Sequence, residues 1–82
     1  MTEDQASYPA LLREQAAAYA GAAAAAEEAA LMHDRRAETM VHLASVAGIA
    51  RQGAVNKRLD RDKYRALEQA MLAGARALED RG

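Results

Sequence analysis

Polar side chains suited to binding nucleic acid gather in residues 51–65 of this 82-residue chain. Arginine pairs with guanine edges, asparagine and glutamine suit adenine, and lysine suits phosphate. The candidate DNA-binding residues are Arg51, Gln52, Asn56, Lys57, Arg58, Arg61, Lys63 and Arg65. We expect the first five to face the bases and backbone and the last three to hold flanking phosphates, an interaction that weakens as salt rises.

The distribution of charge supports the same prediction. Residues 1–34 carry six acidic residues against one basic residue, whereas residues 51–65 carry six basic residues against two acidic ones. A basic segment within a chain of formal net charge −1 is typical of contact with a polyanion. A solvated basic surface without a nucleic-acid partner is the alternative interpretation.

Other site chemistry is missing from the sequence. The chain has no cysteine, and His33 and His42 lie nine residues apart on opposite-facing helical positions, so we expect no metal site. Glu27 and Glu28 are adjacent and point in different directions, which does not suit paired acid–base catalysis. We therefore expect a non-enzymatic protein with no cofactor and no small-molecule ligand.

Alanine dominates the elements that must position the basic segment. Hydrophobic residues make up 51% of the chain, but 23 of them are alanine and only 19 are larger. Alanine favours helix and contributes little apolar area, so an isolated monomer has a thin core. We expect a partner surface, most simply a second copy of the chain.

Helical signals cover the whole chain and no segment alternates like a strand, so the fold class is all-α. We expect a small bundle of three to four helices in one domain: a frayed segment at 1–6, an Ala-rich helix over 8–32, a helix-turn-helix within 35–59 and an amphipathic helix over 61–80. Asp34 and Asp60 are candidate N-caps. The first two helices can also fuse, because no proline or glycine lies between Gly21 and Gly48.

The segment 43–59 has the residue order of a helix-turn-helix. Leu43 and Ala44 give the apolar and small pair of the first helix, Gly48 the turn and Ile49 the plug. AGIARQGAVNKRL, residues 47–59, resembles the A-G-I-S-R-Q-A-V-x-K-R-L cores of many small bacterial helix-turn-helix DNA-binding proteins. The resemblance implies a reading helix that begins at Arg51 and Gln52, in a cytoplasmic regulator.

The segment departs from that pattern at three points. Ala50 occupies the N-cap position of the second helix, where Ser or Thr would stabilise the helix by about 1 kcal/mol relative to alanine. Gly53 lies inside the reading helix, and the extra residue before Val55 rotates the apolar position by about 100°. The alternative is one long helix that continues to Gln52, with Gly53 as a left-handed C-cap and the basic residues in a loop.

The second functional hypothesis is a helical protein-interaction module, such as an adaptor, an antitoxin or a virion or assembly component. Its oligomer or partner interface would be formed by small and aromatic residues at helical spacing: Tyr19, Ala22, Ala26, Ala66, Ala70 and Ala73. YRALE, residues 64–68, also fits the loose Y-x-x-x-[DE] pattern of type VII secretion substrates, although their Trp-x-Gly turn is absent. No segment predicts a membrane span.

Overall fold

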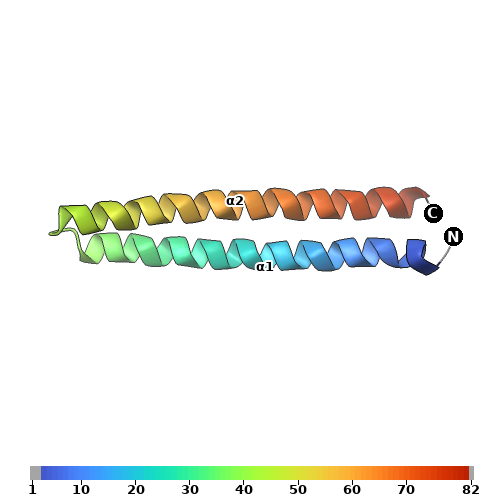
Figure 1. The fold of residues 1–82 in the computed structure, drawn as a ribbon, viewed down its shortest axis with the longest axis horizontal. Helices are drawn as coiled ribbons and strands as arrows, with labels where there is room; N and C mark the ends of the chain where they lie inside the picture. The colour runs from blue at the N-terminus through green and yellow to red at the C-terminus, as the bar shows by residue number, and fades with distance from the viewer. Residues whose placement is uncertain (1–2, 82) are drawn as a thin grey trace.

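The protein is an antiparallel pair of long helices. The computed structural model describes the backbone of residues 3–81 and the side chains of residues 7–81. Helix α1 spans Glu3–Thr39 and helix α2 spans Ala44–Arg81. They lie side by side over their whole length, with both termini at one end and the connecting loop at the other (Figure 1). The all-α prediction is confirmed for the described residues.

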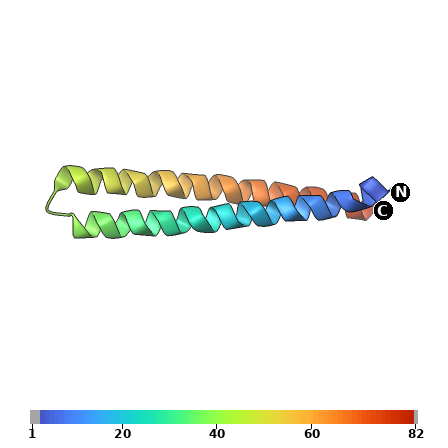
Figure 2. The same ribbon diagram turned by 60° about the horizontal axis from the view of Figure 1, so that its bottom comes forward.

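The hairpin is a rod of 63 × 13 × 12 Å. When it is turned by 60°, the helices separate at the loop end and overlap near the termini, so they wind about each other (Figure 2). Winding of this kind keeps a contact stripe of 3.5-residue period on the facing side of both helices.

The predicted bundle of three to four helices is not what forms. The Ala-rich segment 8–32 and the segment after Asp34 fuse into α1, because nothing between them breaks a helix. The chain reverses in residues 40–43, where the Leu43 amide donates to the Met40 carbonyl at 2.8 Å. Met1 and Thr2, part of the segment predicted to fray, lie outside the described residues, and α1 is continuous from Glu3.

The predicted helix-turn-helix is also wrong. Helix α2 runs without a break through Gly48 and Gly53, and no described glycine has the positive φ that the turn or the C-cap requires. A glycine inside a helix costs only about 1 kcal/mol relative to alanine. Burial of Ala47, Ala50 and Ala54 against α1 spans both glycines and offsets that cost. Asp60, a predicted cap, lies in the interior of α2.

The facing sides of the helices meet in a contact stripe that we call the seam. Its residues recur at alternating steps of three and four: Leu12, Ala16, Tyr19, Ala23, Ala26, Ala30, His33 and Ala37 on α1, and Ala47, Ala50, Ala54, Lys57, Arg61, Tyr64, Glu68, Met71, Ala75 and Leu78 on α2. All fully buried residues among the described side chains are alanines of this seam. Because alanine has no side chain beyond Cβ, the two backbones can approach closely.

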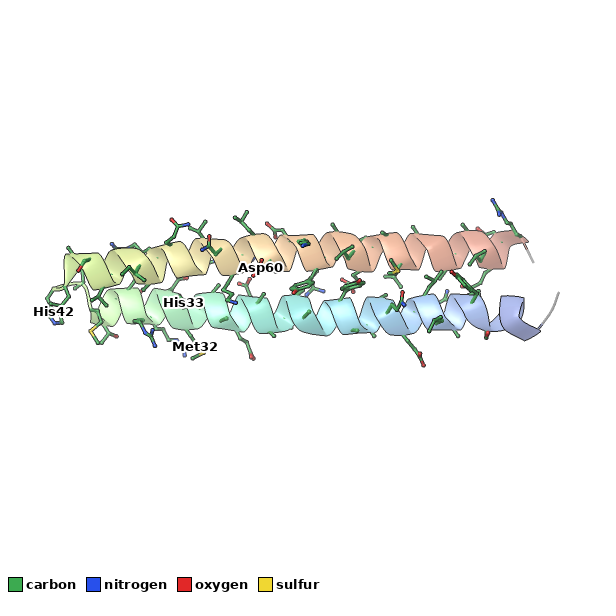
Figure 3. The ribbon with its side chains drawn as sticks, viewed as in Figure 1. Met32, His33, His42 and Asp60 are labelled. Atoms are coloured by element: carbon green, nitrogen blue, oxygen red, sulfur yellow. The ribbon has the colours of Figure 1, made fainter. Side chains whose placement is uncertain are left out.

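The close approach of the helices makes one glycine structurally specific. A Cβ atom placed on Gly53 would lie 3.1 Å from ring atoms of His33, whereas a Cβ on Gly48 would meet open space. The His33 ring lies between the two helices (Figure 3). Gly53 therefore provides the room that His33 needs in the seam.

Candidate protein interaction surface

The predicted DNA-binding residues do not form one surface on α2. Arg51, Arg58 and Arg65 follow one side of the helix at seven-residue spacing, while Asn56 and Lys63 lie on the other side. Lys57 and Arg61 are half-buried in the seam. The Gln52 amide donates to the Asn56 side-chain oxygen at 3.1 Å, so these two side chains bond to each other.

Three of the predicted phosphate and base contacts are occupied by carboxylates of the same chain. Arg58 donates to Asp34 at 2.5 Å, and Arg61 donates to Glu27 at 2.5 Å. Arg65 pairs with Glu68 at 3.0 Å. Further along, Arg13 of α1 pairs with Glu79 of α2. The pairs that join the two helices lie toward the side of the hairpin that carries Asp34 on α1 and Arg58 on α2. We call this side the ion-paired face.

Three of these paired groups, Asp34, Arg58 and Arg61, have shifted pKa values. The hydrogen bond from Arg58 lowers the pKa of the Asp34 carboxyl below its ordinary value. The same bond raises the pKa of Arg58, and hydrogen bonds to Glu27 and then Asp62 raise the pKa of Arg61. The charged forms of Asp34, Arg58 and Arg61 are therefore favoured in the folded hairpin.

The basic segment of the sequence thus lies beside acidic residues of the same chain. Counted from the sequence, α1 carries seven acidic and three basic residues, and α2 carries five acidic and eight basic residues. The helices therefore have formal charges of −4 and +3, which agree with the chain total of −1. Opposite charge on neighbouring helices favours the antiparallel pairing without any polyanion.

Two of the predicted partner residues lie inside the hairpin. Ala26 is buried in the seam, and the Tyr19 ring stacks on Tyr64 with centroids 6.3 Å apart. Ala22 is half-buried, whereas the others, Ala66, Ala70 and Ala73, are exposed. The two fixed positions of YRALE also have structural contacts, because Tyr64 stacks on Tyr19 and Glu68 pairs with Arg65.

A second stripe of three- and four-residue steps runs beside the seam on each helix. We call these residues the open face: Leu11, Gln15, Ala18, Ala22, Ala25, Ala29, Met32 and Arg36 on α1, and Val46, Ile49, Gly53, Asn56, Asp60, Lys63, Leu67, Ala70, Gly74 and Ala77 on α2. Both stripes lie on the same side of the hairpin, since Ala22, Ala25 and Ala29 line one shallow hollow together with Asp60. The open face was not predicted from the sequence as one surface. Most of its residues are small, so it differs little in hydrophobicity from the other sides of the helices.

The open face carries large apolar side chains and little charge. Ile49 is 74% exposed and Met32 is 65% exposed, and Met32 points away from α2 (Figure 3). Arg36, Asp60 and Lys63 are its only charged members. None of the three has an ion-pair partner among the described side chains. By contrast, the ion-paired face alternates charged residues with single apolar ones such as Leu31 and Val55.

The loop end also exposes apolar side chains. Val41 is 63% exposed, and Met40 and Leu43 are exposed beside it. His42 lies at the tip of the hairpin (Figure 3). Within residues 3–81, neither helix has the uninterrupted apolar stretch that crossing a bilayer requires. The described side chains also form no cluster of three or more groups able to hold a metal ion.

Comparison of the chain with models of protein families, with curated proteins and with solved structures found no match. No relative therefore lends a function to this chain. The features that distinguish the hairpin physically are its alanine seam, its ion-paired face and its open face.

Proposed function

We propose that this protein is a non-enzymatic, helical protein-interaction module of the adaptor or assembly type. The observation that supports the proposal is that the small apolar side chains are buried and several large ones are exposed. Alanines fill the buried seam, whereas Ile49, Met32 and Val41 lie mostly in solvent. Single exposed apolar residues are ordinary, but a continuous apolar surface on a small protein marks a binding site for another protein.

Photo-crosslinking tests this proposal in the cells that make the protein. A photoreactive side chain at Ile49 samples the open face, and the same group at Gln69 samples the ion-paired side of α2 as a matched control. We expect protein adducts at Ile49 and few at Gln69. Equal labelling at the two positions, or no adduct at Ile49, would count against an interaction surface on the open face.

DNA binding is the second candidate, and three free cations favour it. Arg51, Lys57 and Lys63 have no ion-pair partner among the described side chains. Binding to random duplex DNA that weakens steeply with salt and disappears in the variant Lys57→Glu, Lys63→Glu would support this candidate. Absence of binding at low salt would leave the interaction module as the function.

A further inference from the structure

We propose that the open face binds a second copy of this chain, so that two hairpins form an antiparallel four-helix dimer. This inference rests on the proposed function, because it names the partner of the same surface. In the dimer α2 lies on α2 and α1 on α1, each pair antiparallel about a two-fold axis across the middle of the rod. Each helix then has one seam within its own chain and one with the second copy.

The positions of the open face suit this arrangement. On each helix the open stripe lies about 100° around the axis from the seam, close to the right angle of a square bundle. A helix in a square bundle needs two such stripes, one for each neighbour. A hairpin that stayed alone would need only the first.

The charges at the centre of the open face complement themselves. Asp60 and Lys63 lie near the middle of α2 (Figure 3 labels Asp60), and both are exposed. A two-fold axis that passes between them brings Asp60 of one chain beside Lys63 of the second copy, and the reverse. The two charges without a partner in the hairpin thus become two reciprocal ion pairs.

The same axis pairs large with small side chains toward the two ends of the α2 stripe. Reflection about the point between Asp60 and Lys63 places Ile49 opposite Gly74 and Val46 opposite Ala77. At these two pairs a large residue meets a small one, as interdigitating packing requires. Nearer the axis, Gly53 meets Ala70 and Asn56 meets Leu67. On α1 the two-fold axis places Ala22 of one chain opposite Ala25 of the second copy. Both residues lie at the level of Asp60, since all three line the same hollow. One axis thus serves both helices.

The size of the face is sufficient for a stable dimer. A rod 63 Å long and 13 Å wide offers a footprint of roughly 800 Å² on each partner, which is the size of a typical specific interface. Because the axis lies close to the midpoint of α2, nearly the whole length overlaps. The alanine seam leaves an isolated hairpin with little buried apolar area, and the dimer supplies more.

Sedimentation equilibrium of the purified full chain tests the dimer. We expect the wild type to have twice the 8.8 kDa chain mass at micromolar concentration. Asp60→Lys places only positive charge at the axis, and Lys63→Asp only negative charge, so each should weaken dimerisation at least about tenfold. Mixing the two variants, or combining both changes in one chain, should restore it. Asp62→Lys is the matched control on the other face.

A second pair of variants tests the apolar contact. Ile49→Glu should weaken the dimer, whereas Val55→Glu, at an exposed β-branched position on the ion-paired face, should not. Circular dichroism checks that each variant stays helical. A wild type that remains monomeric at millimolar concentration overturns the inference, as does a dimer insensitive to Asp60→Lys and Ile49→Glu. If the protein is monomeric but Ile49 still crosslinks to other proteins in cells, the dimer is overturned and the proposed function stands. If it is monomeric and gives no such adducts, both proposals are overturned.

Discussion

At the scale of single residues, the two glycines of α2 have different surroundings. Gly48 lies on the surface and Gly53 lies under the His33 ring. We expect Gly48→Ala to raise the free energy of unfolding by about 0.5–1 kcal/mol, because alanine restricts the unfolded chain and favours helix. Gly53→Ala should gain less or destabilise, because its Cβ would lie 3.1 Å from the ring. Urea denaturation followed by circular dichroism measures both.

A His33→Ala background is the control for this comparison. Without the ring, Gly53→Ala should gain as much as Gly48→Ala. If Gly53→Ala stabilises the wild type as strongly as Gly48→Ala, then the His33 ring moves aside without cost and Gly53 is not needed for the close packing of the seam.

The ion pair between Asp34 and Arg58 makes a pH-dependent contribution to stability. Because the hydrogen bond from Arg58 lowers the native pKa of Asp34, the pair stabilises the fold above the unfolded-state pKa of about 3.9. This contribution is lost as pH falls through the lowered native pKa. We expect Asp34→Asn to lower the melting temperature slightly at pH 7 and not at about pH 2, as thermal denaturation can measure.

Glu28→Gln is the matched control for Asp34→Asn. Glu28 lies on the same helix and has no ion-pair partner among the described side chains. Its neutralisation should leave the melting temperature unchanged at both pH values. An equal effect of the two substitutions at pH 7 would mean that total charge, and not the contact with Arg58, sets the stability.

At the scale of the helices, the buried alanines fix how closely α1 and α2 pack. Ala30 is fully buried in the seam, and Ala24 is exposed on the same helix. Ala30→Leu should force the helices apart and lower the free energy of unfolding by about 1–3 kcal/mol. Ala24→Leu should change it little. Similar effects at the two positions, measured by urea denaturation, would show that the seam tolerates larger side chains.

The helices were predictable from the sequence as a class, but their ends were not. Alanine content and the lack of strand alternation sufficed for the all-α prediction. Helix α2 does not break at Gly48, because a glycine in a helix costs little and burial of Ala47 and Ala50 in the seam offsets that cost. The reversal instead falls at residues 40–43, which contain no glycine or proline to mark it.

The candidate site was predictable only in part for a similar reason. The shortage of large apolar residues led to the expectation of a partner surface. Which alanines remain available to a partner depends on which stripe the hairpin itself uses, and Tyr19 and Ala26 belong to that stripe. The basic segment predicted an external anion because the sequence does not reveal that Glu27 and Asp34 lie beside Arg61 and Arg58.

At the scale of the whole molecule, two modes of association of the rod would give particles of different length. The exposed residues of the loop end, Met40, Val41 and Leu43, could join two hairpins tip to tip, which would nearly double the 63 Å length. The open face instead joins them side by side. We expect the maximum dimension from small-angle X-ray scattering to stay close to that of one hairpin while the scattering mass doubles, because the two-fold axis lies near the middle of the rod. Val41→Glu, at the tip, should leave the mass unchanged, whereas Ile49→Glu should halve it. A particle nearly twice as long, sensitive to Val41→Glu, would assign the association to the tip.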